Sequence, residues 1–386
     1  MVTGRNFSLR SGPLASYSAH KAEIDAAVQR VLQSGWYIFG KEVTAFEEEF
    51  AGYIGTNFAV GVGSGTEALH LALLACGVGQ GDEVITVSHT AVATVAAVEL
   101  SGATPVLVDI DPATYTMDPK KIEAAVTPRT RAVLPVHLYG HPADMAPIRD
   151  IADRHGLYVI EDCAQSHGAL YRGRKVGLWG HVAAFSFYPT KNLGAVGDGG
   201  MVVTSDPKLA DSLRLLRQYG WRSRDDSLVP GTNSRLDEIQ AAVLRVKLPY
   251  LDEDNQRRRA LAAVYSAALE GTGVSLPREE GHVQHVYHLY VVQARDRQSL
   301  RDHLKSAGVD TQVHYPIPVH LQSAYRGRLA PEGSLPCTEQ VMRQIVSLPI
   351  HPHLTEDDVR AVASLVAEWS AGRGGMRTEN ADGPSV

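Results

Sequence analysis

The sequence has few cysteines. Three occur in 386 residues, and Cys76, Cys163 and Cys337 are odd in number and far apart along the chain. A disulfide framework and the common zinc motifs both need paired or clustered cysteines, so this spacing excludes them. We therefore expect cysteines that stay reduced, as in the cytoplasm.

Long apolar runs and a surplus of positive charge are also missing. The longest apolar stretch, residues 91–100, is far shorter than the roughly 20 residues that cross a bilayer. Residues 2–18 are polar and lack the apolar core of a secretory signal. The formal net charge is -6, so no global positive field would hold a nucleic acid. These absences predict a cytoplasmic protein that binds neither membranes nor nucleic acids.

The composition and its pattern indicate an α/β protein. Hydrophobic residues make up 44% and charged residues 21% of the chain, the balance of a soluble globular enzyme. Between residues 57 and 205, β-rich runs alternate with helical runs, which is typical of a mainly parallel sheet covered by helices. The expected strands are 58–62, 83–87, 104–109, 131–138, 158–162, 183–187 and 200–205. The expected helices are 66–76, 92–100 and 119–125, the last with Asp118 as its N-cap.

The pattern changes in the last third of the chain. Helices are expected at 236–246, 257–269 and 300–307, with one strand at 287–293. A boundary near residue 250 would separate a large domain, 21–250, from a smaller C-terminal α/β domain, 251–371. Residues 1–20 would form an N-terminal arm. Residues 372–386 are rich in glycine and polar residues without periodicity, so we expect a disordered tail.

A glycine-rich turn stands between an expected strand and an expected helix. It runs Gly63-Ser64-Gly65-Thr66-Glu67-Ala68. Glycines there let backbone N–H groups approach an anion, and a helix N-terminus favours negative charge. A purely structural βα turn is the alternative, because glycine and serine are common in such turns. The partial match Gly61-x-Gly63-x-Gly65 lacks the spacing of a dinucleotide fingerprint.

Two acids, Glu161 and Asp162, follow the apolar run 157–160. Ligands of open α/β sheets bind at the carboxyl ends of the parallel strands. We interpret Asp162 as the partner of a cofactor's ring nitrogen, where an aspartate keeps a pyridine protonated and electron-withdrawing. An N-cap or a salt-bridged surface acid is the alternative.

Lys191 follows an aromatic strand. Phe185, Phe187 and Tyr188 precede it, and the glycine-rich run 194–200 comes after it. A lysine behind a strand is most often solvated, but this neighbourhood is poor in polar surface. Burial lowers the pKa of an ammonium group, and a Schiff-base amine needs a lowered pKa.

These motifs together resemble the DegT/StrS family of sugar aminotransferases. Four segments occur in the family's order, and the similarity covers residues 20–370. They are Ser64 to Leu69, Glu161-Asp162-x2-Gln165, Ser186-x4-Lys191-Asn192, and Gly231 to Arg235. The resemblance implies the aspartate-aminotransferase fold, fold type I of the enzymes that use pyridoxal 5'-phosphate.

The resemblance also implies roles for single residues. Lys191 would hold pyridoxal 5'-phosphate as a Schiff base and then move a proton while the cofactor passes through its pyridoxamine form. Asp162 would bind the ring nitrogen, and Gln165 would lie beside the ring. The phosphate would be held by Gly65, Thr66 and Ser186. Asn233 would reach the phosphate of the neighbouring subunit's cofactor, which predicts a homodimer with two shared sites.

One position departs from the family's pattern. An aromatic side chain usually covers the cofactor ring just after the Ser-x-Thr of this region, but this chain has Ala91 there. We expect His89 to cover the ring instead. A histidine satisfied at the end of a strand is the alternative.

The substrate side rests on finer resemblances. Tyr188, followed by Pro189, and the pair His314-Tyr315 are similar to relatives that act at C3 of dTDP-3-keto-6-deoxyhexoses. The resemblance also implies L-glutamate as the amino donor. Tyr219 and Arg222 would contact the substrate, Arg222 as a bidentate partner of a diphosphate; plain surface packing is the alternative. Amination at C4, or of a keto-inositol, stays open.

Three rival functions have weaker support. A nicotinamide dehydrogenase would need an acidic residue at the end of the second strand, which instead ends at Val87-Ser88. A DNA-binding regulator would need a basic helix, and the one cluster of arginines is 257–259. A metal hydrolase would use His282, His285 and His288, but a three-residue spacing near the start of a strand does not place three ligands on one face.

Overall fold

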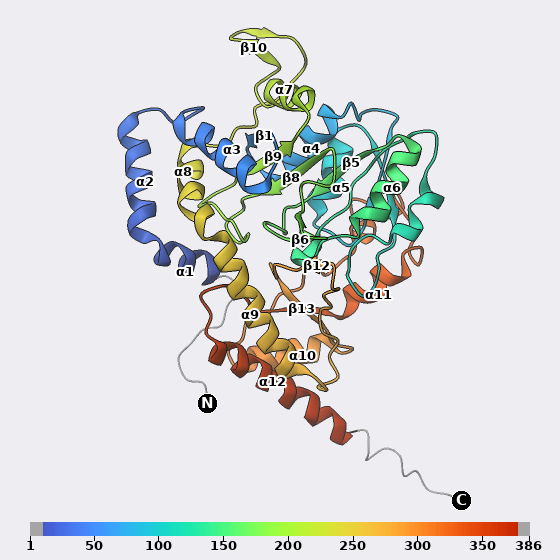
Figure 1. Ribbon diagram of the computed structural model, residues 1–386. Coiled ribbons are helices and arrows are strands. Elements are labelled where there is room, and N and C mark those ends of the chain that lie inside the picture. The colour runs from blue at the N-terminus through green and yellow to red at the C-terminus, as the bar shows by residue number, and fades with distance from the viewer. Residues whose placement is uncertain (1–10, 377–386) are drawn as a thin grey trace, which may run out of the picture.

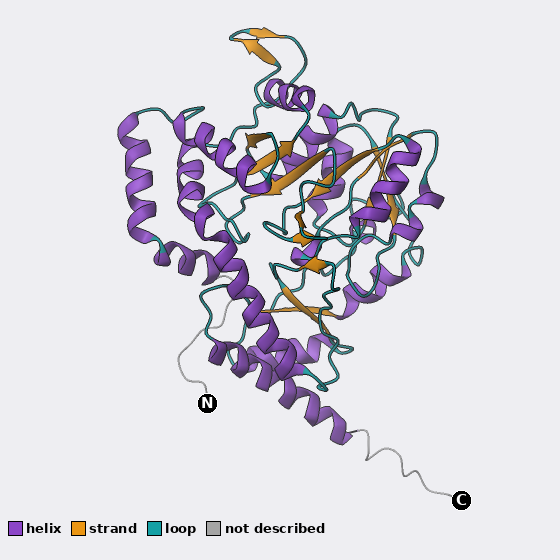
Figure 2. Cartoon of the chain, viewed as in Figure 1, coloured by secondary structure: helices purple, strands orange, loops and turns teal. Residues whose placement is uncertain are grey.

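The structure is a computed structural model that describes residues 11–376 (Figure 1). A seven-stranded sheet forms its centre (Figure 2). In spatial order the strands are β1 (Phe58–Val62), β9 (Gly200–Thr204), β8 (Val182–Ser186), β5 (Tyr158–Asp162), β4 (Thr130–Val133), β2 (Glu83–Val87) and β3 (Thr104–Val108). Strand β9 pairs antiparallel with β1 and β8, and the other pairs are parallel. The expected α/β fold with a mainly parallel sheet is confirmed.

Both faces of the sheet are buried. Along β8, Val182 and Ala184 belong to one apolar cluster, whereas Ala183 and Phe185 belong to another. This alternation explains why the strands have near-continuous apolar sequences. The first cluster includes residues of α4 (Gly65–Ala75), α5 (Val92–Leu100), α6 (Met145–His155) and α7 (Pro207–Leu216). The second includes residues of α3 (Lys41–Ile54) and α8 (Glu238–Lys247).

A separate apolar cluster lies in the lower part of the molecule in Figure 1. It is built from α9 (Leu251–Leu269), α10 (Arg297–Ser306), α12 (Glu356–Met376), and the antiparallel pair β13 (Tyr290–Gln293) and β14 (Ile345–Leu348). Helix α9 leads from the sheet region into this cluster (Figure 1). These elements follow residue 250, in the part of the chain predicted to form a smaller C-terminal α/β domain, and that division stays a prediction.

The remaining elements surround these two parts. Helix α2 (Lys21–Ser34) packs against α8. The others are α1 (Ser11–Ala19), the small sheet of β12 (Val283–Gln284), β6 (Leu170–Tyr171) and β7 (Arg174–Lys175), the hairpin β10 (Trp221–Ser223) and β11 (Asp226–Ser227), and α11 (Pro336–Gln344). Short 3-10 helices are η1 (Pro119–Lys121), η2 (Glu123–Ala125), η3 (Leu138–Gly140), η4 (Leu248–Tyr250) and η5 (Val319–Leu321). None of the helices in the described part of the chain is long and apolar enough to cross a membrane.

Several expected elements differ in the structure. Residues 119–125 form two 3-10 turns and no α-helix, although Asp118 caps the first turn as expected. The strand expected over 131–138 ends at Val133, and η3 follows. Helix α9 begins six residues before the expected 257, so the chain is helical near the predicted boundary at residue 250, which stays a prediction.

The ends of the chain were also predicted. Residues 11–19 of the predicted arm form α1, and residues 1–10 lie outside the described part. Helix α12 continues to Met376, past the predicted start of the tail at 372. Residues 377–386 again lie outside the described part, so the predicted disorder there stays untested.

Candidate active site

A cavity of about 220 Å³ lies where three strands of the sheet end. Its wall includes the start of α4 behind β1, the residues that end and follow β5, and the residues that end and follow β8. Seven of the residues predicted from the sequence line it: Gly65, Thr66, Asp162, Gln165, Ser186, Tyr188 and Lys191. Segments more than a hundred residues apart therefore meet at one place, because the carboxyl ends of parallel strands share one edge of the sheet.

The start of α4 faces this cavity and offers backbone N–H groups. Ser64 caps the helix, because its hydroxyl accepts from the backbone N–H of Glu67 at 3.2 Å. The N–H groups of Gly65 and Thr66 lie in the first turn, where an α-helix supplies no carbonyl partners. A Cβ at Gly65 would lie 2.5 Å from the Cβ of Ser186, so a side chain there would collide with the cavity wall. The N–H groups at the start of α4 and the hydroxyl of Ser186 together form a cradle for an anion.

Lys191 sits in a tight turn behind β8. Its backbone N–H donates to the carbonyl of Tyr188 at 2.9 Å. Burial lowers the pKa of its ammonium from 10.5 to about 8, and Asp162 opposes this effect. The neighbouring imidazoles of His167 and His288 have lowered pKa values, first because of burial and then because of Lys191. Both histidines are therefore neutral and add no positive charge beside Lys191. Asp162 is the charged group that opposes the lowering of the Lys191 pKa.

Asp162 ends β5 and is 5% exposed. Burial raises the pKa of its carboxyl, while hydrogen bonds and Lys191 oppose the rise. One oxygen accepts from the N–H of Ala164 at 3.1 Å and the other from the hydroxyl of Thr94 at 2.9 Å. The carboxylate is thus held in one orientation on the wall of the cavity that Lys191 also lines.

Gln165 connects the two parts of the molecule. Its carbonyl accepts from the backbone N–H of Tyr139 at 2.7 Å, and its amide donates to the hydroxyl of Tyr315 at 3.1 Å. Burial is the main cause that raises the pKa of Tyr315 to about 12. His314 lines a second cavity, which also includes Lys191. The predicted pair His314-Tyr315 therefore lies beside the site.

His89 does not line the cavity around Lys191, so the expectation that it covers a bound ring is not supported. Its ring is fully buried, with its Nε2 2.8 Å from the hydroxyl of Tyr139 and its edge against Tyr115. Burial lowers its pKa to about 3, which keeps it neutral. The alternative, a histidine at the end of a strand that packs in the core, fits better. Ala91, in contrast, does line the cavity.

Besides His89, His314 and Tyr315, three more predicted residues lie outside this cavity. Arg222 lies in the β10–β11 hairpin, and Tyr219 lies two residues before β10. The hairpin projects from the top of the molecule in Figure 1. Tyr219 is 39% exposed, and its ring packs against Trp221. Asn233 is exposed, and its side-chain oxygen accepts a hydrogen bond from the Nε–H of Arg235 at 2.6 Å. A single chain does not bring these residues to Lys191.

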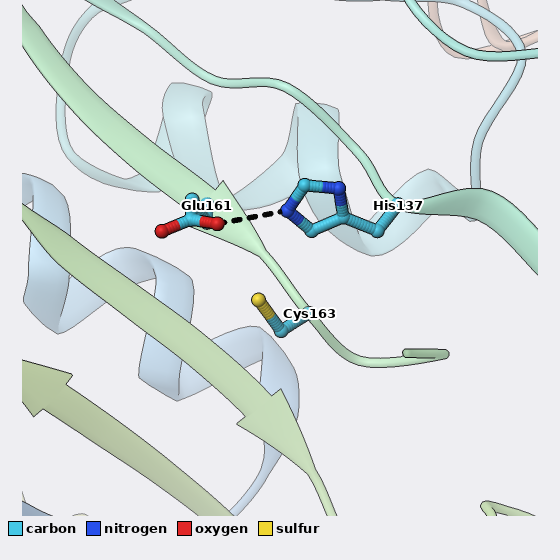
Figure 3. Close-up of side chains that lie close together, drawn as sticks. All are labelled: His137, Glu161 and Cys163. Carbon is cyan, nitrogen blue, oxygen red and sulfur yellow. Dashed lines mark hydrogen bonds and ion pairs between the residues drawn. The ribbon is translucent and has the colours of Figure 1, made fainter. Parts of the chain in front are cut away.

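Figure 3 shows a buried cluster behind the site, made of His137, Glu161 and Cys163. Their donor atoms lie within 4.8 Å of one another, the spacing of a metal site. Glu161, however, accepts four hydrogen bonds: one from His137 and three from the backbone N–H groups of Gly177, Trp179 and Gly180. Burial raises the pKa of the Cys163 thiol, which keeps it protonated. Saturated oxygens and a neutral thiol indicate a structural cluster.

The rival metal site is contradicted. Within the described part of the chain, the cluster in Figure 3 is the one group of potential ligands, and it contains none of the three predicted histidines. His282 packs on Tyr171, His285 stacks on Tyr287, and His288 lies 3.1 Å from Asn192. The dehydrogenase is contradicted too, because the sheet does not have the strand order 3-2-1-4-5-6 of a dinucleotide-binding fold.

Sequence reasoning missed part of the site. Thr90 and Asp198 line the cavity, and Thr94 holds Asp162 from behind. Asn192 was noticed as part of a motif, but its role is structural. Its side chain donates to Asn255 at 2.8 Å and to the carbonyl of Val286 at 3.2 Å. No local pattern marks such residues, because their partners are remote in the sequence.

A sequence profile of the DegT/DnrJ/EryC1/StrS aminotransferase family matches residues 18–367. The chain belongs to this family. The dTDP-3-amino-3,4,6-trideoxy-alpha-D-glucose transaminase of Streptomyces venezuelae is 55% identical over 357 residues, 92% of this chain and 94% of that protein. The resemblance inferred from four motifs is thereby confirmed, and this family member is an aminotransferase.

Solved structures agree with this assignment. The crystal structure of S. venezuelae DesV in complex with a ketimine intermediate is 54% identical with a TM-score of 0.91, and the match covers 95% of this chain and 98% of that chain. The crystal structure of NtdA from Bacillus subtilis, with the bound cofactor PMP, is 32% identical with a TM-score of 0.86, covering 95% and 86%. The expected fold of this aminotransferase is therefore confirmed.

Proposed function

We propose that this aminotransferase uses pyridoxal 5'-phosphate to move an amino group from L-glutamate to C3 of a dTDP-3-keto-6-deoxyhexose. The observation that carries the proposal is a single cavity that holds an amine of lowered pKa, a buried carboxylate and an anion cradle. These are the groups that an aldehyde, a pyridine nitrogen and a phosphate each require. The residues present therefore fit this cofactor.

The proposal gives each of these residues a defined task. The Lys191 amine bonds the cofactor and later moves a proton between the substrate carbon and the cofactor. Asp162 would hold a proton on the ring nitrogen, and the cofactor, when bound, would supply an electron-withdrawing ring next to the carbon that exchanges its proton. Gly65, Thr66 and Ser186 bind the phosphate. Gln165 lies beside the ring, where its two hydrogen bonds fix its side chain.

The lowered pKa of Lys191 supports this assignment quantitatively. An amine attacks an aldehyde in its neutral form, and an ordinary lysine with a pKa of 10.5 is almost wholly charged near neutral pH. A pKa of about 8 raises the neutral fraction near pH 7 by a factor on the order of a hundred. The burial around β8 therefore prepares Lys191 for its reaction.

The proposed sugar and carbon rest on relatives. The S. venezuelae transaminase is named for a 3-amino dTDP-sugar, and it covers nearly the same length as this chain. Tyr188 is 51% exposed at the cavity, His314 lines a second cavity together with Lys191, and Tyr315 accepts a hydrogen bond from Gln165. These three side chains would contact a sugar. Tyr219, Arg222 and Asn233 would act in the cavity of a neighbouring subunit, so we also propose a homodimer.

A panel of keto-sugar nucleotides tests the proposal. Purified protein with L-[15N]glutamate is incubated with 3-keto and 4-keto dTDP-sugars, their UDP counterparts and a keto-inositol, and products are read by mass spectrometry. We expect the label in a 3-amino dTDP-6-deoxyhexose. Label in a 4-amino sugar or an aminocyclitol would replace the proposed carbon or substrate. Label in no product, with no visible absorption after pyridoxal 5'-phosphate is added, would overturn the proposed chemistry.

A further inference from the structure

The buried carboxylate of Asp162 has two requirements that oppose each other. It must stay ionised to hold a proton on a ring nitrogen, as the proposed function requires, yet burial favours its neutral form. The groups that influence its charge are Lys191, His137 and the hydrogen-bond donors Thr94 and Ala164, and Tyr315 is close enough to be influenced in turn. The N–H of Ala164 binds one oxygen and the hydroxyl of Thr94 the other, so Thr94 is the one side chain that hydrogen-bonds this carboxylate among the described residues.

A second hydroxyl orients the first. The Oγ1 atoms of Thr90 and Thr94 are 2.7 Å apart, and both side chains are 1% exposed. An ionised carboxylate accepts hydrogen bonds and cannot donate one, so the single proton of Thr94 points to Asp162. Thr90 must then donate to Thr94. The two threonines therefore form a directed chain that starts at the cavity wall, which Thr90 lines, and ends on the carboxylate.

The direction of this chain selects one charge state. A protonated Asp162 whose proton lay on the oxygen facing Thr94 would have to donate to Thr94, and both hydroxyls would have to turn around. Thr94 is the third residue of α5, so the first turn of the helix fixes its position relative to β5. We propose that Thr94, oriented by Thr90, is a positioning residue that keeps Asp162 ionised and aimed into the cavity. This inference rests on the proposed function.

The test compares three variants. Thr94→Val keeps the shape of the side chain and removes the hydroxyl, and Thr94→Ser restores the hydroxyl. Thr86→Val is the matched control, because Thr86 is a fully buried threonine whose hydroxyl donates at 2.9 Å to the carbonyl of Leu134, the residue that follows the neighbouring strand β4. Folding of each variant is checked by its melting temperature without cofactor. The readouts are the pH midpoint of the visible absorption of the cofactor-bound protein, kcat, and KM for the sugar nucleotide.

We expect Thr94→Val to lower kcat roughly tenfold at little change in KM, since it removes one hydrogen bond to a charged group. The pH midpoint should shift from the wild-type value by about half a unit or more, because a less firmly ionised Asp162 holds the proton on the ring nitrogen less tightly. Thr94→Ser should recover most of both values, and Thr86→Val should leave both unchanged. In an Asp162→Asn background, Thr94→Val should add almost nothing.

Other results would overturn the inference. A wild-type pH midpoint in Thr94→Val, an equal shift in Thr86→Val, or an undiminished effect in the Asp162→Asn background would each show that Thr94 does not act through Asp162. These outcomes leave the proposed function intact. A wild-type protein that gains no visible absorption from pyridoxal 5'-phosphate would remove the proposed function, and this inference with it.

Discussion

The cavity around Lys191 and the β10–β11 hairpin differ in how much of their setting one chain provides. Around the cavity, strand ends and a helix start bring seven predicted residues together, and Asp162 and Gln165 each use both of their polar side-chain atoms. At the hairpin, Arg222 and Asn233 are exposed, and the apolar side chains Leu228 and Val229 face solvent. The first region is prepared for chemistry by its own fold, whereas the second presents exposed groups that do not line the cavity of the same chain.

The largest expected effect on activity comes from removing the amine of Lys191 from the cavity. Lys191→Ala should lower transamination at least about a thousandfold, because both the covalent attachment and the proton carrier are lost. Activity is measured from the amino product, and cofactor attachment from the mass after borohydride reduction. Lys175→Met is the matched control, a partly buried lysine of lowered pKa that donates to the carbonyl of Tyr53 far from the cavity. Equal losses in both variants would contradict the role of Lys191.

The next effect separates two neighbouring acids inside the cavity region. Asp162→Asn should lower kcat about a hundredfold or more with little change in KM for the sugar, because the charge next to the ring is lost. Glu161→Gln should instead destabilise the fold by about 1–3 kcal/mol, since an amide NH2 would face backbone donors. Turnover numbers and urea unfolding curves distinguish the two results. Loss of kcat and of sugar binding in equal measure would contradict the role of Asp162.

A smaller effect tests the hairpin side of the comparison. Asn233→Ala should weaken cofactor binding roughly tenfold, by loss of a hydrogen bond to a charged phosphate. At a cofactor concentration too low to load Asn233→Ala alone, mixing unfolded Asn233→Ala with unfolded Lys191→Ala and refolding them should give about a quarter of the wild-type activity, since half of the dimers would be mixed, each with one intact site. Activity that stays at the level of the separate variants would contradict sites shared between subunits.

The smallest expected effect concerns the pKa of Lys191. The rate at which protein without cofactor takes up pyridoxal 5'-phosphate should rise with pH and level off above about 8, where the buried amine is neutral. With an ordinary lysine the rise would continue towards pH 10.5. Stopped-flow absorbance between pH 6 and 10 measures the midpoint, and Lys175→Met is again the control. A midpoint near 10 would show that burial does not lower this pKa in solution.

Much of the cavity could be predicted because its groups stand at the ends of apolar strands. Asp162, Ser186 and Lys191 follow runs of buried residues, and a parallel sheet brings such ends together whatever the details of the connections. The direction of β9 could not be predicted in this way. Its apolar sequence suits a parallel or an antiparallel neighbour, and pairing with β1 and β8 decides it.

Errors arose where long-range contacts overrule local patterns. His89 was expected to replace the missing aromatic at position 91, two residues further on, but Tyr115 and Tyr139, both buried in the core, surround its ring and hold it there. The run 131–138 has β propensity to its end, yet the backbone turns into η3, where Tyr139 adopts a positive φ of 62°. Its N–H then bonds to Gln165, a partner that no local rule selects.

The amino-acid sequence by itself determined the α/β class, the chemical groups of the site and the order of the motifs that mark the family, because apolar periodicity and residue chemistry are local properties. The tertiary structure decided the rest. In the folded chain, burial lowers the pKa of Lys191, and Thr94 donates a hydrogen bond to Asp162. The β10–β11 hairpin projects from the molecule, and its residues do not line the cavity. Burial and hydrogen-bond partners depend on segments far apart in the chain, so they exist only once the fold has formed.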